Sequence, residues 1–501
     1  MAHGPLPARG AASRAISGPW TEPHLPLASP IDRAAGILLI LDLALVALGR
    51  WGGGTWMEPV EYACAAAVAG LLAARASRQP RVFVGIGVLL SLIALATLPG
   101  GAALIGDGLA QAAFIAAFFA ALATLRHAAE SSPSIRDCGL FLASRPPGRR
   151  YAALTLGGAA FGTVLNYGSI ALLGSLATAS AEAEPNPEIR EIRTRRMLLA
   201  TARGLVAMLP WSPLSFAIAI TTALIPGASW AGVLPYALVS GLLLASIGWA
   251  MDSILKPRLS ASASASASAS ASAPGAGRAE PEPGGWARTL PLVTLLAVIG
   301  GGAATLHLAT GVSIVGVVMV WAPLVSAAWV WLQGPGARWR RLSSRAAGYT
   351  VRDLPRYRAE IVLLMMAGFI GAVGSGLLAP VVRGAGLHLE LVPAWALLLS
   401  ALWLMPLAGQ IGMNPILAAS LLAPLLPSPE AMGVSPEAVV CAFTAGWAVA
   451  GASSPYTAST LMLAAFSGTT ARRVGLVWNG AYALVCGVAL SAWVLCIAYL
   501  L

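Results

Sequence analysis

The sequence predicts an all-α protein that crosses a membrane many times. Of its 501 residues, 57% are apolar and only 10% are charged, whereas soluble globular proteins carry about 25% charged residues. This much apolar surface cannot be hidden inside one water-soluble fold, because a folded domain must still present polar groups to water. The composition therefore excludes a soluble enzyme, a disordered chain and a nucleic-acid-binding domain.

Apolar stretches of the right length support this fold class. A helix that spans the hydrocarbon core needs about 20 mostly apolar residues. Two stretches, 151–178 and 391–427, do not fit as simple spans. The eleven predicted spans are 34–50, 59–76, 81–98, 101–125, 198–224, 229–252, 289–308, 311–332, 359–381, 435–466 and 474–500.

The charge excess of +11 indicates the orientation. Arginines gather in the segments between the predicted spans, and cytoplasmic loops of membrane proteins are enriched in Arg and Lys. The arginine-rich segments are 75–81, 126–150, 190–196, 338–358 and 472–473. We therefore expect a bacterial inner-membrane protein with a cytoplasmic N-terminus and a periplasmic C-terminus.

The stretch 151–178 has a basic cytoplasmic flank at both ends, so it must enter and leave on the same side. Two arms of about 14 residues each reach about 21 Å, less than the ~30 Å hydrocarbon core. The sequence predicts a re-entrant hairpin with its turn at 165–169, where Asn and Gly suit a turn. By the same reasoning, 391–427 is an opposed hairpin that enters from outside and turns at 409–415.

The chain divides into two halves. Residues 1–33 read as a flexible cytoplasmic tail, and a Ser/Ala-rich segment at 256–288 reads as a cytoplasmic linker. The linker separates a first half, 34–255, from a second half, 289–501. Five scattered cysteines without regular spacing indicate neither a disulfide framework nor a metal centre.

An internal repeat relates the two halves. The spacing from Gly to Ser-Pro is 8 residues in each half, and the two copies lie about half a chain apart. Because the hairpins enter from opposite sides, this is an inverted-topology repeat, a plan common among secondary transporters. The repeated order is Asn166, Gly204 and Ser212-Pro213-Leu214-Ser215 in the first half, and Asn414, Gly446 and Ser454-Pro455-Tyr456-Thr457 in the second.

The prolines predict broken helices at 198–224 and 435–466, because proline removes a helical hydrogen bond. Such breaks expose carbonyls to a cation and amides to an anion. Proline could instead only kink each helix, with hydroxyls satisfying the freed carbonyls, but the duplication favours a binding site. The predicted substrate- and ion-binding residues are Asn166, Gly168, Ser169, Ser212, Pro213, Ser215, Asn414, Ser454, Pro455 and Thr457.

Three further polar residues in apolar segments, Arg203, Thr444 and Asn479, are accessory candidates. Arg203 could attract an anion, although extension to the cytoplasmic interface is the commoner behaviour of such a side chain. Asn479 could pair with the broken helix, although helix packing is the commoner explanation. Asp42 and Asp107 lie outside the repeat, where a scaffold or oligomer role fits at least as well.

Two broken helices, two opposed hairpins and a half-chain repeat resemble the ion transporter superfamily, and in particular the divalent anion/sodium symporter family. Asn166 and Asn414 match the central Asn of that family's hairpin tips, and Ser212-Pro213 and Ser454-Pro455 match its broken-helix elements. The resemblance implies sodium and carboxylate binding at these residues and an elevator motion. The tips here lack the family's flanking Ser and Thr, which leaves proton coupling or another anion open.

The sequence thus predicts a secondary active transporter for a small, anionic solute, coupled to Na⁺ or H⁺ and without a cofactor. No nucleotide-binding or hydrolase motif is present, and Lys256 is the only lysine. The expected partners are the lipid bilayer, the solute and a second copy of the chain, not nucleic acid. An ion antiporter or metalloid exporter on the same scaffold, and a permease subunit, remain alternatives. A lipid-modifying membrane enzyme is disfavoured because no cluster of Asp, His or Lys lies near one interface.

Overall fold

The computed structural model describes residues 29–130, 132–182, 184–255, 260, 285–333, 336–385 and 388–501. Throughout these residues the chain forms helices and turns and no strand, so the predicted all-α polytopic membrane architecture is confirmed. Eight of the described helical segments are long and apolar enough to cross a membrane. Three predicted spans are not among the eight. The spans 34–50 and 59–76 form helices that each carry several charged residues, and the span 198–224 is divided between two separate helices, Pro187–Met208 and Phe216–Leu224. The number of eleven spans therefore stays a prediction.

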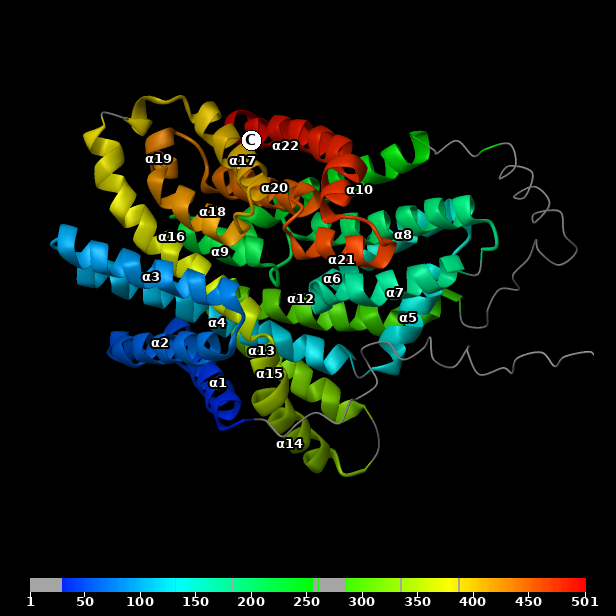
Figure 1. The fold of residues 1–501 in the computed structure, drawn as a ribbon, viewed down its shortest axis with the longest axis horizontal. Coiled ribbons are helices and arrows are strands. Elements are labelled where there is room, and N and C mark those ends of the chain that lie inside the picture. The colour runs from blue at the N-terminus through cyan, green and yellow to red at the C-terminus, as the bar shows by residue number, and fades with distance from the viewer. Residues whose placement is uncertain are drawn as a thin grey trace, which may run out of the picture.

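One group of helices packs around α4, whose residues 112–121 are all buried. Figure 1 shows α1, α2, α3 and α13 beside α4, and each of them packs against it. The group and its connections are α1 (Pro30–Arg50), η1 (Thr55–Met57), α2 (Glu58–Arg75), α3 (Arg78–Thr97), α4 (Gly101–Glu130), η2 (Gly285–Thr289), α12 (Leu290–Thr310), α13 (Ile314–Leu332), α14 (Arg338–Gly348), the π-helix η3 (Tyr349–Asp353), α15 (Leu354–Arg356) and α16 (Arg358–Gly384).

The second group holds both repeats. Each repeat consists of a pair of antiparallel helices, a helix in two pieces and a long final helix. In the first half these are α5 (Pro133–Ala143), α6 (Pro147–Leu165), α7 (Gly168–Glu182), α8 (Pro187–Met208), α9 (Phe216–Leu224) and α10 (Trp230–Ile254). In the second half they are η4 (Leu389–Leu391), α17 (Ala394–Gln410), α18 (Pro415–Leu422), η5 (Ala423–Leu425), α19 (Pro429–Met432), α20 (Pro436–Ser453), α21 (Ala458–Ser467), the π-helix η6 (Arg473–Trp478) and α22 (Gly480–Leu500).

The repeated glycines have the same structural role in both halves. Gly204 brings α8 against α6 so closely that a Cβ there would lie 2.1 Å from the carbonyl oxygen of Thr155. Gly446 brings α20 against α17, where a Cβ would lie 2.5 Å from the carbonyl oxygen of Leu402. Each glycine thus packs the first piece of a broken helix on the first arm of its own hairpin.

The two repeats interlock through the second pieces of the broken helices. The piece α9, from the first half, packs against α18 and α20 of the second half. The piece α21, from the second half, packs against α7 and α8 of the first half. This exchange of partners is the arrangement that a two-fold relation between the halves requires, and it supports the repeat that the sequence predicts.

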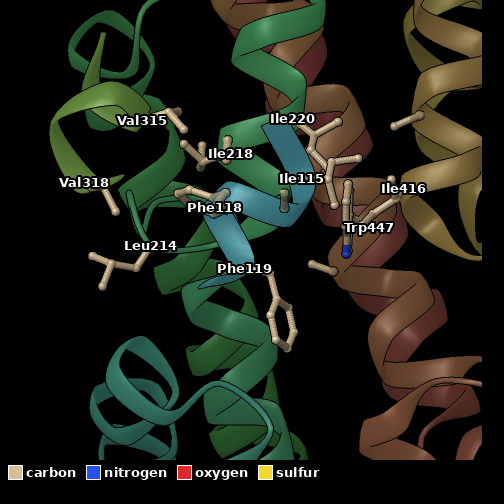
Figure 2. Close-up of a cluster of buried hydrophobic side chains, with 14 of the residues drawn as sticks. Ile115, Phe118, Phe119, Leu214, Ile218, Ile220, Val315, Val318, Ile416 and Trp447 are labelled. Carbon is tan, nitrogen blue, oxygen red and sulfur yellow. The ribbon is translucent and has the colours of Figure 1, made fainter. Parts of the chain in front are cut away.

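A buried apolar cluster joins the two groups of helices (Figure 2). Phe118 of α4 meets Phe216, the first residue of α9, in an edge-to-face contact with ring centroids 5.2 Å apart. Aromatic pairs of this geometry are favourable beyond the area they bury. Figure 2 places Val318 of α13 and Trp447 of α20 in the same cluster. The first break is therefore held against α4 by apolar packing.

The predicted domain boundaries are only partly within the described residues. Ser29 accepts a hydrogen bond from the amide of Asp32 and begins α1, so the last residues of the predicted tail 1–33 are helical. Of the predicted linker 256–288, the structure describes residue 260 and residues 285–288, the latter within η2. The remainder of both segments lies outside the described residues.

Candidate functional site

The first helix break lies between α8 and α9, at the predicted Ser212-Pro213 step. The Ser215 hydroxyl caps α9, since its oxygen accepts from the amide of Ile218 at 3.2 Å. The same hydroxyl donates to the carbonyl of Leu209 at 2.7 Å. Ser212 Oγ accepts from the amide of Leu214 at 3.3 Å. Both hydroxyls therefore stabilise the break itself.

The second break lies between α20 and α21 and repeats this hydrogen-bond pattern. Ser454 Oγ accepts from the amide of Tyr456, two residues later, at 3.2 Å. Thr457 Oγ1 lies 3.4 Å from the carbonyl of Gly451, six residues earlier, and donates to it. Ser212 and Ser215 make the same two kinds of bond at the same offsets. This local equivalence is independent support for the internal repeat.

The first hairpin turns at Asn166, as the sequence predicts. Asn166 ends α6 with φ of 51°, and asparagine tolerates this region of backbone space better than most residues do. Ser169 donates its hydroxyl to the carbonyl of Asn166 at 2.7 Å and fixes the turn. Gly168 begins α7 next to α4, and a Cβ there would lie 3.5 Å from Nε of Arg126. Whether the hairpin re-enters the membrane stays a prediction.

A cavity of about 40 Å³ separates this hairpin tip from the first break. Asn166 lines it from the tip, and Leu214 and Phe216 line it from the break. Arg126 and Glu360 line it from α4 and α16. Arg126 donates to Glu130 at 2.8 Å and lies over the ring of Tyr357 at 4.9 Å. Of the predicted first-half residues, Asn166 alone lines this pocket, and two of the pocket's walls are charged.

Sequence reasoning missed the charged walls of this pocket. Arg126 and Glu360 lie at the ends of two predicted spans, outside the repeat, and the charge pattern of the sequence predicts Arg126 in a cytoplasmic loop. In the sequence, Arg126 and Glu360 are recognisable only as charged residues at the end of an apolar segment. Many charged residues at the membrane interface have the same position, so this feature does not identify a site. Only the packing of α4 and α16 against the hairpin brings them to the site.

At the second hairpin the tip and the break touch directly. Ser454 donates its hydroxyl to the carbonyl of Gly409 at 2.6 Å, and Gln410 Nε2 lies 3.4 Å from Ser453 Oγ. Asn414 caps α18, because its Oδ1 accepts from the amide of Ile416 at 2.8 Å. In this conformation the side-chain oxygen of Asn414 is therefore engaged in capping α18. Tip and break are thus joined by a hydrogen bond in the second half and separated by a small cavity in the first.

Arg203 occupies a third position, between the two halves. Its side chain is only 6% exposed, so it does not extend to the interface as the sequence analysis favoured. Nε donates to Oδ1 of Asn479 at 3.1 Å, and Nη1 donates to the hydroxyl of Tyr151 at 3.1 Å. The guanidinium also lies 4.3 Å from the ring centre of Tyr482. The Arg203 side chain is buried because α8 packs against α20 and α21 of the second half, which are far from it in the sequence.

The elements around Arg203 converge on the second break. A cavity of about 10 Å³ beside the guanidinium is lined by Gly451, Ser459 and Thr460 together with Asn479. The π-helix η6 lies against the same break, since a Cβ on Gly475 would meet the carbonyl oxygen of Ser453 at 2.2 Å. Asn479 follows η6 directly, and its backbone N–H donates to the carbonyl of Val474. The wide turn of η6 thus places the side-chain carboxamide of Asn479 beside Arg203.

Arg203 forms no ion pair with a carboxylate anywhere in the described part of the chain. Its partners there are a neutral amide, a phenol and an aromatic face. A buried charge is costly unless it is paired. This position can therefore stabilise an anion that reaches the second break.

Other candidate residues lie away from these contacts. Thr444 donates back to the carbonyl of Val440 within α20 at 2.9 Å, and its side chain is buried there. Asp42 is fully buried in α1, and both its carboxylate oxygens lack a hydrogen-bond partner among the described residues. The described residues hold no group of three or more His, Cys, Asp or Glu side chains arranged to bind a metal.

Several solved structures match this chain, among them the following two. The YdaH transporter of Alcanivorax borkumensis aligns with a TM-score of 0.56 at 19% identity, over 83% of this chain and 98% of that chain. MtrF of Neisseria gonorrhoeae, described as illuminating a class of antimetabolite efflux pumps, aligns with a TM-score of 0.43 at 14% identity, over 96% and 97% of the two chains. No protein-family model and no curated protein sequence matches the chain. The similarity to YdaH shows a shared fold.

Proposed function

We propose that this protein is a secondary active transporter that carries a small anionic solute across the membrane, coupled to Na⁺ or H⁺. The observation that carries the proposal is the pair of interlocked repeats, each with a helix break facing a hairpin tip. Broken helices at a repeat interface are the usual binding sites of such transporters. The fold shared with a protein described as a transporter supports the same conclusion.

The charge distribution around the breaks supports an anionic solute. Arg203 supplies a buried positive charge whose partners in the described residues are neutral. The amide ends of α9 and α21 contribute partial positive charge at the two breaks. A solute carboxylate or comparable anion placed between Arg203 and the second break would compensate the guanidinium in a low-dielectric site.

In this proposal the predicted binding residues hold the backbone of the two breaks in place around the site. Ser212, Ser215, Ser454 and Thr457 bond backbone groups of the breaks in the present conformation. A substrate or coupling ion would reach the carbonyls and hydroxyls when the hairpin tips separate from the breaks. The elevator motion, the homodimer and the inner-membrane location stay predictions.

Transport in proteoliposomes tests the proposed function. The purified chain would be reconstituted, and uptake of a panel of radiolabelled mono- and dicarboxylates measured with an imposed Na⁺ gradient, with an imposed proton gradient and with neither. We expect at least one carboxylate to accumulate above its equilibrium level when one gradient is present. Uptake that only reaches equilibrium under every gradient, or no uptake of any anion, would contradict a coupled anion transporter.

A further inference from the structure

The short helix α14 has the composition of a membrane-surface helix. Its eleven residues include four arginines and no acidic residue. At 100° per residue, Trp339, Leu342 and Ala346 fall on one arc of the helix, and the arginines fall on the remaining arc. Trp339 is 74% exposed, and α14 has no buried residue among those the structure describes. On the apolar arc Trp339 and Ala346 are exposed and Leu342 is half-buried, so the rest of the chain covers the arc only in part.

The position of α14 is that of an interfacial element. It follows α13, one of the helices long and apolar enough to cross a membrane. The ring of Trp339 meets that of Trp331, near the end of α13, edge to face with centroids 4.5 Å apart. Tryptophan is enriched at the level of lipid headgroups. Figure 1 shows α14 at the margin of the molecule, next to α15.

Asp353, which follows α14 in the chain, has other partners. Asp353 pairs with Nδ1 of His127 at 3.1 Å and with Arg356 at 3.9 Å. Across the described residues, Arg338, Arg340 and Arg345 take part in no ion pair with a carboxylate. These three arginines thus lack a carboxylate counter-charge among the described residues, and Arg338 and Arg340 are exposed while Arg345 is half-buried.

We propose that α14 lies along the membrane surface and binds the headgroups of anionic phospholipids through Arg338, Arg340 and Arg345. Trp339 enters the interfacial layer beside Trp331 and sets the depth of the helix. Basic amphipathic helices bind membranes by this combination of apolar insertion and attraction to anionic lipids. This surface is separate from the proposed transport site, because α14 lines neither the pocket at Asn166 nor the one at Arg203.

Native mass spectrometry of the full-length protein in detergent tests the proposal. Phosphatidylglycerol and phosphatidylcholine with the same acyl chains would be titrated against the wild type and against the triple variant Arg338→Gln/Arg340→Gln/Arg345→Gln. Each arginine near an anionic lipid surface contributes about fivefold in affinity. We expect the triple variant to lose at least tenfold in phosphatidylglycerol binding and to bind phosphatidylcholine as the wild type does.

A second triple variant, Arg78→Gln/Arg136→Gln/Arg149→Gln, removes the same charge from exposed positions outside α14. It should keep the wild-type lipid preference, and free glycerol phosphate should not displace the lipid. Trp339→Ala, which keeps every arginine, should weaken binding of both lipids a few-fold and provides a readout if the triple variant fails to fold. Unchanged phosphatidylglycerol binding in the α14 variants, or an equal loss in the second triple variant, would overturn the proposal.

Discussion

Arg203 donates to two neutral oxygens and lies over an aromatic ring, so its charge is solvated by the protein but not neutralised by a carboxylate among the described residues. Such a cation stays buried at a net cost that an incoming anion would offset. The polar groups around it also fix its direction, because Asn479 and Tyr151 hold two of its nitrogens. The residue is therefore oriented before a ligand arrives.

We expect Arg203→Gln to reduce anion uptake at least tenfold while the protein still folds. Arg203→Lys should retain part of the activity, because it keeps the charge but loses the planar, branched donor geometry. Initial uptake rates in proteoliposomes, with thermal unfolding as the check on folding, measure this. Arg195→Gln, a neighbouring arginine that stacks on Trp478, is the matched control and should stay within twofold of wild type. Equal uptake by Arg203→Gln and wild type would remove Arg203 from the site.

Asp42 presents the opposite situation, a carboxyl group buried in α1 with no hydrogen-bond partner on either oxygen among the described residues. Removing a group that can carry an unpaired charge should not destabilise the protein. We expect Asp42→Asn to unfold at a temperature at least as high as that of wild type and to transport within twofold of it. A tenfold loss of transport in a stable variant would instead assign Asp42 to ion coupling.

At the scale of elements, Gly204 and Gly446 control how closely each broken helix approaches its hairpin. A Cβ at either position would overlap a backbone carbonyl of the neighbouring helix, which cannot move aside as a flexible side chain could. Overpacking of this kind costs about 1–3 kcal/mol. We expect Gly204→Ala and Gly446→Ala each to lower the thermal midpoint by several degrees.

The matched control for these substitutions is Gly85→Ala in α3. No atom lies within 4 Å of the Cβ that it would introduce, and alanine is the better helix former. Its midpoint should equal or exceed that of wild type in the same scanning fluorimetry or calorimetry experiment. Similar thermal midpoints for all three variants would contradict this prediction. They would mean that the added methyl group fits between α8 and α6, and between α20 and α17, without steric overlap.

The elements that were predictable from sequence are those with local causes. Pro213 and Pro455 lie at the two helix breaks, and the Asn166 turn follows from residues that favour turns. Proline alone does not locate a break, because Pro235, Pro323, Pro380 and Pro406 lie inside continuous helices; the repeated Ser-Pro step did. The π-helix η6 has no such local signal, and Asn479 beside it acquires a partner only through packing. Burial of Arg203 likewise depends on contacts between halves more than 200 residues apart in sequence.

At the scale of the whole molecule, each repeat supplies packing partners for the broken helix of the other. Because α9 packs on α18 and α21 packs on α7, neither broken helix can shift without the hairpin of the opposite half. The group around α4 contacts this unit through apolar side chains such as Phe118 and Phe216, a surface that allows sliding because few directional bonds cross it. We therefore expect the interlocked repeats to move as one body.

If that body moves relative to α4 during transport, fixing it to α4 must stop transport. In a variant with all five native cysteines replaced by alanine, we expect Phe118→Cys/Phe216→Cys to be cross-linked by a flexible bifunctional thiol reagent long enough to span both ring positions, since the ring centroids of the native side chains lie 5.2 Å apart. Cross-linking should reduce uptake at least tenfold, and a reversible reagent should allow recovery after reduction. The two single-cysteine variants, treated identically, should keep their uptake. A cross-linked protein that transports at the uncross-linked rate would show that α4 and α9 stay together throughout the cycle, which is incompatible with an elevator motion across this surface.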